Sequence, residues 1–326
     1  MTSGSFLEPI SANHFDNARM NQLNTPVALI VFNRPAATRR VFAAVAAARP
    51  SRLLIIADAP RPDRPGEQQR CEEVMKIVSA VDWPCTVETN LATENLGCRR
   101  RVKTGLDWVF SLVEEAIILE DDCLPNPSFF PYCSQLLERY RDCGQVGIIS
   151  GFNPMQRSFP FPYSYYFTKL VLIWGWATWR RTWQKYDESL TSWPKVKEDG
   201  LLKFMWRRRK PLESWTNIFD SMQSGTGPNA WSYNLVYTSW MRNWLNIVPA
   251  RNLIQNIGFD QDATHTKKAD VGFKIPAETL SFPIEHPPAM IDWPDYAERF
   301  QDRFHTPGLM LRMRNKLESL LMPSSK

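Results

Sequence analysis

The chain has 326 residues, of which 44% are hydrophobic and 22% charged, so it can bury a substantial core. Its 39 basic and 34 acidic residues give a formal charge of +5, which is too small an excess to indicate a nucleic-acid-binding protein in the absence of a basic groove. We therefore expect a globular protein of one large domain or two closely packed ones, with no nucleic-acid partner, and not a disordered chain.

The N-terminal segment and the cysteines bear on where the protein works. Residues 1–24 are polar and lack the apolar stretch of a signal peptide, and no apolar run approaches the ~20 residues needed to cross a bilayer. The six cysteines include no C-x-x-C pair, and several stand in apolar contexts, which favours reduced thiols. We expect a flexible leader over residues 1–24 and a cytoplasmic protein, with the inner face of the membrane as one place where it works.

Short β-prone runs alternate with helix-like stretches from residue 26 to residue 150. The runs occupy 26–32, 52–58, 85–91, 116–121 and 145–150, and the stretches between them occupy 36–48, 66–81, 98–115 and 128–143. Three of the runs are almost entirely apolar, which is typical of strands covered on both faces. Asn126 and Pro127 fit the N-cap and the first position of the fourth helix. The alternation predicts an α/β fold with a mostly parallel, Rossmann-like sheet flanked by helices.

The sequence changes character near Gly151, where we place a subdomain boundary. The residues that follow are rich in aromatic side chains, as in "WGWATWRRTW" at 174–183, and their long loops suit a second lobe built around a site. The tail at 308–321 mixes Leu, Met and basic residues and can be drawn as a helix. That helix would either make a peripheral contact with a membrane or dock on the protein, and its irregular apolar stripe favours docking.

Polar residues follow four of the predicted strands, at the edge of the sheet where open α/β folds bind ligands. They are Asn33 and Arg34 after the first strand, Asp58 after the second, Asn95 and Arg100 after the third, and Glu120, Asp121 and Asp122 after the fourth. Carboxylates hold hard cations such as Mg²⁺ or Mn²⁺, the cation neutralises a diphosphate, and an arginine or a helix N-terminus takes the remaining charge. The combination therefore predicts a site for a nucleotide diphosphate and a metal ion.

Each of these residues also has a purely structural interpretation. An acidic stretch before a proline is ordinary turn and capping material, Asp58 fits a turn equally well, and the arginines at 99–101 fit a solvated helix face. The position of the acidic triplet after a buried strand favours the metal interpretation, because three adjacent carboxylates without a cation raise one another's pKa. The chain carries neither a Walker motif nor G-x-G-x-x-G after the first strand, which argues against a P-loop NTPase and a dinucleotide oxidoreductase.

A set of scattered motifs resembles the GT-A glycosyltransferases, in particular bacterial sugar transferases similar to the protein N-acetylglucosaminyltransferases of the Golgi. The motifs are "VFNRP", "IIADAPR", "NLG", "ILEDD", "SGFN", "IWGWATW" and "NLIQNIGF", followed by "DATHT", and they span residues 25–268. The resemblance implies metal-dependent transfer of a sugar from a nucleotide-diphosphate sugar to a glycan or lipid-linked acceptor, with a UDP-sugar and inversion favoured. It also implies a nucleotide-sugar-binding subdomain at 25–150, an aromatic-rich acceptor-binding subdomain at 151–270 and a C-terminal extension at 271–326.

The resemblance assigns roles to the residues at the strand ends. Asp122, the last carboxylate of the triplet, would bind Mn²⁺ or Mg²⁺, while Glu120 and Asp121 would orient the sugar nucleotide. Arg34 and Asp58 would hold the base. A late histidine, His265, either joins the metal or diphosphate or makes only a structural hydrogen bond.

The general base is where the chain departs from the family. The family has an aspartate after a tryptophan in the second lobe, and the matching segment here reads Trp231-Ser232. A serine hydroxyl is too weak a base at neutral pH unless another group activates it. Asp260 and Asp262 are the candidate substitutes. The alternatives are an inactivating change of Asp to Ser at 232, and a protein that binds a nucleotide or a glycan without transferring sugar.

The segment around Trp174, Gly175 and Trp176 is predicted to contact the acceptor. Flat aromatic faces with polar edges suit a sugar ring, and glycine permits close backbone approach. For any single tryptophan a core position is the more common outcome.

Overall fold

The computed structural model describes residues 22–156, 161–258 and 275–305. Its strands are β1 (Val27–Val31), β2 (Arg52–Ala57), β3 (Thr86–Leu91), β4 (Glu115–Glu120), β5 (Cys123–Pro125), β6 (Val146–Ser150), β7 (Tyr165–Thr168), β8 (Trp176–Trp179), β9 (Leu245–Pro249) and β10 (Ile254–Asn256). Its helices are α1 (Pro35–Ala48), α2 (Glu67–Val78), α3 (Gly97–Leu112), α4 (Phe129–Arg139), α5 (Arg180–Trp183), α6 (Trp193–Glu198), η2 (Leu201–Phe204), α7 (Arg209–Gln223), α8 (Ser232–Met241), α9 (Pro294–Phe300) and η4 (Gln301–His305).

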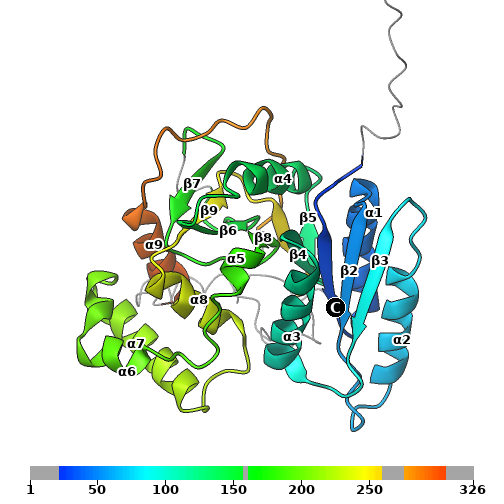
Figure 1. The fold of residues 1–326 in the computed structure, drawn as a ribbon, viewed down its shortest axis with the longest axis horizontal. Coiled ribbons are helices and arrows are strands. Elements are labelled where there is room, and N and C mark those ends of the chain that lie inside the picture. The colour runs from blue at the N-terminus through cyan, green and yellow to red at the C-terminus, as the bar shows by residue number, and fades with distance from the viewer. Residues whose placement is uncertain (1–21, 157–160, 259–274, 306–326) are drawn as a thin grey trace, which may run out of the picture.

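Eight of the strands form one sheet in the order β3-β2-β1-β4-β8-β6-β9-β7 (Figure 1). The pairs β3–β2, β2–β1, β1–β4 and β6–β9 are parallel, whereas β8 runs antiparallel to β4 and β6, and β7 antiparallel to β9. Strands β5 and β10 form a separate antiparallel pair. The predicted fold class, a mostly parallel α/β sheet flanked by helices, is confirmed.

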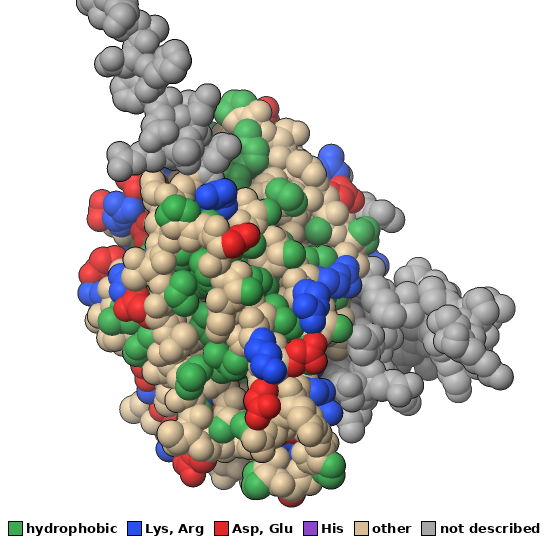
Figure 2. Space-filling view, turned by 90° about the vertical axis from the view of Figure 1, so that its right-hand side faces the viewer, with side chains coloured by type: hydrophobic (Ala, Val, Ile, Leu, Met, Phe, Trp, Pro, Cys, Tyr) green, Lys and Arg blue, Asp and Glu red, His purple; other side chains and the backbone are tan. Residues whose placement is uncertain are grey.

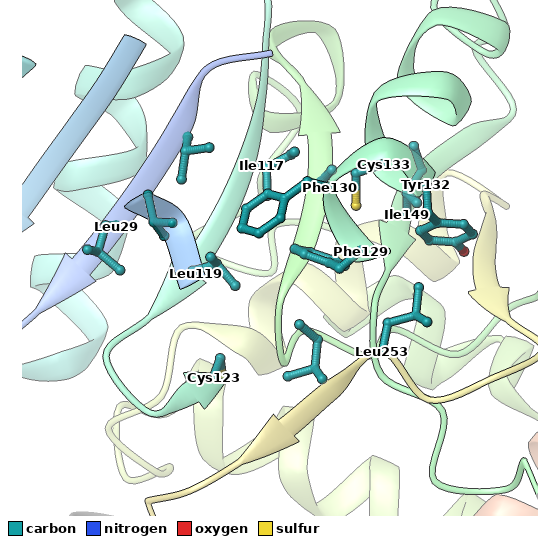
Figure 3. Close-up of a cluster of buried hydrophobic side chains, with 14 of the residues drawn as sticks. Leu29, Ile117, Leu119, Cys123, Phe129, Phe130, Tyr132, Cys133, Ile149 and Leu253 are labelled. Atoms are coloured by element: carbon teal, nitrogen blue, oxygen red, sulfur yellow. The ribbon is translucent and has the colours of Figure 1, made fainter. Parts of the chain in front are cut away.

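Alternation along β1 shows how the two faces of the sheet are covered. Val27, Leu29 and Val31 pack in one apolar cluster with α1, α2 and α4, whereas Ala28 and Ile30 pack in a second cluster with α3 and α8. Figure 3 shows the first cluster, in which side chains of β1, β4 and α4 meet between the sheet and the helix. Helices on both faces explain why these strands read as continuous apolar runs.

Many of the aromatic residues after Gly151 form a third cluster. It is built mainly on α6, α7 and α8 and includes Trp193, Trp215, Phe219 and Trp240. This part contains the predicted aromatic-rich lobe, but three strands from the same stretch of sequence join the main sheet. The predicted subdomains on the two sides of Gly151 therefore share one sheet, and the boundary itself stays a proposal.

Several predicted boundaries are wrong for identifiable reasons. The third helix was expected to reach residue 115 but ends at Leu112, because Glu115 pairs with Trp179 in the β4–β8 ladder. The fourth helix begins at Phe129, because the side chain of Asn126 accepts a hydrogen bond from the amide of Ser128 at 3.0 Å and so closes a turn before the helix. Asn126 is therefore not its N-cap.

Two further observations concern the cysteines and the helices. All six cysteines are free thiols. Among the residues that the structure describes, no helix is both long enough and apolar enough to cross a bilayer. The predicted leader at 1–24 falls outside the described residues except for its last three, and the tail at 308–321 falls wholly outside them.

Candidate functional site

Two adjacent parallel strands bring Arg34 against the acidic triplet. Arg34 follows β1 and the triplet ends β4, and β1 and β4 are paired. The Nη1 atom of Arg34 lies 2.5 Å from Oδ2 of Asp122 and 3.7 Å from Oδ1 of Asp121. Asp121 also accepts a hydrogen bond from the amide of Phe32 at 3.1 Å. The predicted role of Arg34 was to hold the base, but the structure directs its guanidinium to the carboxylates.

The triplet carries more negative charge than its surroundings neutralise. Burial, followed by repulsion from Asp122, raises the pKa of both Glu120 and Asp121 above the ordinary carboxyl range. Arg34 opposes these shifts, and among the described residues it is the one cation set against both groups. The site therefore favours an additional positive charge, which either protons or a bound cation can supply.

The chain after β10 closes over Asp122. The amide of Ile257 donates to the carbonyl of Asp122 at 2.8 Å, and a Cβ added at Gly258 would lie 2.1 Å from Oδ2 of Asp122. Any side chain at position 258 would collide with the carboxylate. Asp260, Asp262 and the candidate metal ligand His265 follow in the sequence and lie outside the described residues.

Asn33 leads to a second buried carboxylate. Its Nδ2 atom donates to Oε1 of Glu67 at 2.7 Å, and the guanidinium and the amide of Arg61 also donate to Glu67. The hydrogen bonds from Arg61 lower the pKa of the buried Glu67 to about 2. This network fixes the loop after β1 to the start of α2. The hydrogen bond to Glu67 thus holds the side chain of Asn33 in place at the end of β1.

Asp58 organises the start of α3. Its carboxylate accepts hydrogen bonds from the amides of Leu96 at 2.9 Å and Gly97 at 3.0 Å, and Asn95 donates to the carbonyl of Ala59 at 2.6 Å. The "NLG" turn is thereby held to the end of β2, and the amides at this helix N-terminus are directed to Asp58. In this conformation Asp58 serves the turn, which was the structural alternative in the sequence.

The basic residues of α3 differ in their settings. Arg100 is exposed and lies 4.0 Å from Glu94. Arg101 is buried, and its guanidinium donates to the carbonyl of Ala57 at 3.1 Å and to the side chain of Asn90 at 2.7 Å. Of these two residues, Arg101 is the buried one, and its hydrogen bonds join the ends of β2 and β3. Arg100 is the exposed one.

A cavity of about 710 Å³ opens beside the ends of β2 and β3. Its lining combines strand-end residues with one side of α2 and includes Asp58, Pro60, Cys71, Met75 and Thr93. Figure 2 shows the side of the molecule that carries α2 and β3, where side chains of both charges stand among hydrophobic ones. A cavity of this size accommodates a ligand of nucleoside dimensions.

The three predicted acceptor residues have three different settings. Trp174 is partly buried and packs against both the first and the third apolar clusters. Gly175 has a φ of +59°, and a Cβ there would lie 2.4 Å from Ile254, so close packing requires glycine. Trp176 is only 1% exposed, and its ring stacks on that of Trp231 with 5.7 Å between the ring centroids. The ring of Trp176 thus lies in the core, and its contact with the acceptor stays a prediction.

A second cavity, of about 230 Å³, contains both Trp174 and Ser232. Its other lining residues are mainly apolar and come from the chain after β6, the 170–173 loop, α7, α8, α9 and the start of η4: Phe152, Leu170, Val171, Leu172, Ile173, Trp215, Tyr233, Val236, Trp240, Phe300 and Gln301. No Asp, Glu or His is among them. The described residues therefore bring Ser232 and Trp174 to one cavity without placing a strong base in its wall.

The cavity and the triplet are neighbours along the same edge of the sheet. The ladder between β4 and β8 pairs Ile118 with Trp176, and from this pair the chains run on by two residues to Glu120 and Trp174. A Cβ on Gly175 would lie 3.3 Å from Leu119. The carboxylates and the aromatic cavity thus lie at the edge of the sheet where β4 ends and β8 begins.

The donor set bears on whether a metal ion fits. Within 22–156, 161–258 and 275–305, no group of three or more His, Cys, Asp or Glu side chains is arranged to hold one. Mg²⁺ and Mn²⁺ at phosphate sites commonly take one or two carboxylates, and phosphate and water oxygens complete the shell. Asp122, which is partly exposed, with Asp121 beside it, fits that pattern better than a metal site built from protein ligands alone.

Comparisons with known proteins give a limited result. No family model matches the chain, and no curated protein matches it. Among solved structures it is similar to an apo UDP-glucose pyrophosphorylase, with 10% identity and a TM-score of 0.33 over 68% of this chain and 90% of that one. A UDP-glucose pyrophosphorylase complexed with UDP-glucose gives 11% identity and a TM-score of 0.24 over 45% of this chain and 64% of that one. Both TM-scores are low, so the proposals below rest on the residues of the site alone.

Two residues of the site, Glu67 and Gly258, had no predicted role, and a third, Arg101, was considered only with the arginines at 99–101 that fit a solvated helix face, whereas it is buried. Glu67 and Arg101 are charged residues within apparently solvated helices, and only their buried hydrogen bonds distinguish them. Gly258 stands in the "NLIQNIGF" motif, and the glycine itself was the one available signal of close backbone approach.

Proposed function

We propose that the protein is a metal-dependent glycosyltransferase that takes its sugar from a nucleotide-diphosphate sugar, with a UDP-sugar favoured. The observation that carries the proposal is the partly buried triplet at the end of β4, whose negative charge exceeds the positive charge of Arg34, its one cationic partner among the described residues. A divalent cation with a diphosphate is the ligand chemistry that such a site attracts. The resemblance of the strand-end motifs to GT-A glycosyltransferases supports the same reaction class.

The donor would lie across the carboxyl ends of β2, β1 and β4. The cavity beside Asp58 would take the base and ribose, and Asp122 would hold the cation with Asp121 beside it. Arg34, which pairs with Asp122 in this structure, would contact the diphosphate once a cation replaces it at the carboxylate. Asn95 and the N-terminus of α3 border the same region, and exposed Arg100 adds positive charge there.

The acceptor would enter the cavity that contains Trp174 and Ser232. The mainly apolar lining suits the flat face of a sugar or the apolar part of a lipid-linked acceptor. The bound cation would stabilise the charge that develops on the departing nucleoside diphosphate. The acceptor hydroxyl must also lose a proton, and Ser232 is poorly suited to accept it. We keep Asp260 and Asp262 as the proposed bases for inversion.

A catalytically silent nucleotide- or glycan-binding protein is the second candidate. Two observations favour it: Ser232 stands where the family has an acid, and no carboxylate or imidazole from the described residues lines the cavity. A silent protein that binds a nucleotide shares nucleotide binding with the first candidate, so turnover separates those two, whereas a silent glycan-binding protein would bind no donor.

Turnover of a panel of donors tests the proposal. UDP-, GDP-, dTDP- and CMP-sugars would be incubated with the full chain, with and without Mn²⁺, and release of free sugar or transfer to added glycans measured. We expect release from one diphosphate donor, dependence on the cation, and loss of at least about tenfold in Asp122→Asn. Asp63→Asn changes an exposed acid whose ion pair with the adjacent Arg64 is 3.8 Å long, and is the matched control. Cation-dependent nucleotide binding without turnover of any donor would favour the silent protein.

A further inference from the structure

Two large apolar side chains stand in solvent on one face of η2. The exposed fractions are 44% for Leu201 and 76% for Phe204. Side chains at i and i+3 superimpose in a 3₁₀ helix, so these two share a face. Leu202 and Trp206 point the other way and are buried in the aromatic cluster. The packing beneath thus fixes the exposure of this pair.

Positive charge surrounds the apolar pair. Seven Lys or Arg residues and three acidic residues lie between positions 195 and 213. The ammonium of Lys203 lies 5.4 Å from the centre of the Phe204 ring. Within the part of the chain that the structure describes, exposed Lys203, Arg207 and Lys210 have no ion-pair partner, so their charges face solvent.

The other basic residues of this stretch are neutralised. Their ion pairs are Lys195 with Glu198 and Asp199, Lys197 with Asp220, Arg208 with Glu298 and Asp302, and Arg209 with Glu213. The acidic residues are thus occupied by these partners, and the surface around Phe204 keeps a net positive charge.

We propose that this surface, Leu201, Lys203, Phe204, Arg207 and Lys210, binds the protein to an anionic lipid bilayer. The two apolar side chains would enter the interface between headgroups and acyl chains, and the three cations would face anionic headgroups. Exposed apolar residues rimmed by unpaired cations complement such a surface, whereas a neutral protein partner would leave those charges uncompensated. The site is distinct from the tail at 308–321, for which a membrane contact was considered from the sequence.

The surface lies on the same lobe as the cavity that contains Ser232. Leu202 and Trp206, directly beneath it, belong to the cluster that includes the cavity residues Trp215 and Trp240. In Figure 1 the neighbouring α6 and α7 lie at the end of the molecule opposite α2 and β3. Binding through this surface would therefore bring the proposed acceptor lobe to the bilayer and leave the proposed donor side away from it.

Co-sedimentation of the full chain with vesicles tests the proposal without any assay of sugar transfer. Phosphatidylcholine vesicles with and without phosphatidylglycerol would be compared. We expect binding to the anionic vesicles, weakening as salt rises. Phe204→Ser should lower the partition coefficient about tenfold or more, and Arg207→Glu with Lys210→Glu should do the same. All the changed side chains are exposed, so melting temperatures should stay near that of the parent.

Matched variants at the opposite end of the molecule distinguish binding through this surface from non-specific binding through any exposed apolar or basic side chain. Leu91→Ser changes an apolar side chain that is 54% exposed at the end of β3, and Arg40→Glu with Arg70→Glu repeats the charge change on α1 and α2. These variants should bind like the parent. Equal losses in them, or no binding of the parent to anionic vesicles, would overturn the proposal. The proposal would also be overturned if the mass of the protein in solution rose with its concentration and Phe204→Ser abolished that rise while vesicle binding persisted.

Discussion

Arg34 donates to Asp122 across 2.5 Å and so joins the ends of two adjacent parallel strands at the candidate site. The same guanidinium lies within 3.7 Å of Asp121. One cation therefore serves several carboxylates, and this imbalance predicts how the ligand-free protein responds to pH.

Glu120→Gln should stabilise the ligand-free protein at alkaline pH. Burial, and then Asp122, raise the pKa of Glu120 above its ordinary value of 4.5. A group with a raised folded-state pKa contributes its stability below the unfolded pKa and loses it as pH rises through the folded one. We expect the variant and the parent to be similar near pH 4.5 and the variant to be more stable at pH ~8.5, by about 1 kcal/mol or more.

Urea denaturation at several pH values measures this difference. Glu115→Gln, at the other end of β4 and paired with exposed Arg141, is the control and should show no such rise with pH. If the difference in unfolding free energy between the parent and Glu120→Gln is constant from pH 4.5 to 8.5, the negative charge of the triplet does not exceed the positive charge around it.

Glu67→Gln should have the opposite pH dependence. The hydrogen bonds from Arg61 lower the pKa of Glu67 from 4.5 to about 2. This contribution to stability is present above the unfolded pKa and is lost as the pH falls from about 4.5 toward 2. At pH 7 we expect a loss of about 1–3 kcal/mol, since the variant leaves Arg61 and Asn33 without a charged acceptor.

Chemical denaturation of Glu67→Gln and of the exposed control Glu72→Gln, each at pH 7 and pH 3, checks this prediction. The difference between Glu67→Gln and the parent should shrink at pH 3. A difference that is equally large at both values would mean that the ionised form of Glu67 is not what stabilises the loop.

Gly258→Ala should damage the ligand site. The added Cβ would lie 2.1 Å from Oδ2 and 2.8 Å from Cβ of Asp122, so the carboxylate or the chain must move. We expect the dissociation constant for UDP with Mn²⁺ to rise at least about tenfold, and a stability loss of about 1–3 kcal/mol. Gly144→Ala, where an added Cβ meets nothing within 4 Å, is the control for titration calorimetry. Unchanged binding in Gly258→Ala would separate the segment after β10 from the nucleotide site.

Ser232→Asp should create or raise turnover if position 232 faces the acceptor hydroxyl. Ser232 begins α8 and lines the cavity with Trp174. An acid in the first turn of a helix is favourable by about 0.3–1 kcal/mol, so the variant should fold. We expect sugar transfer or donor hydrolysis to rise about tenfold or more above the parent, and Ser232→Asn to give no rise. Intact nucleotide binding with no gain in Ser232→Asp would contradict the placement of the base.

The sequence predicted the half of the fold that depends on local pattern. Apolar runs of strand length, with helical stretches between them, gave β1 to β4 and α1 to α4 within a few residues. It did not predict that β8 inserts between β4 and β6, because that position depends on pairing between Trp176 and Ile118, which are far apart in the chain. "WGWATW" therefore looked like part of a separate lobe, although its strand belongs to the main sheet.

The candidate site was predictable to the level of residue types at strand ends. The rule that parallel strands end at one edge placed Arg34 near the triplet. It could not show that Arg34 faces Asp122 rather than a base, or that Asp58 is held by the amides of Leu96 and Gly97. Those outcomes depend on competition among nearby partners for each polar atom, and a sequence does not state distances.

The melting temperature of the protein with UDP and Mn²⁺ tests the central claim most directly. A ligand at about 100 times its dissociation constant stabilises the folded state by about 2.7 kcal/mol, a rise of several degrees. We predict this rise for the parent, its loss on chelation, and its absence in Asp122→Asn, whose ligand-free melting temperature should stay close to that of the parent because one of three repelling carboxylates is removed. The opposite pattern, a less stable Asp122→Asn that still responds fully to UDP and Mn²⁺, would contradict the assignment of Asp122 as the cation ligand.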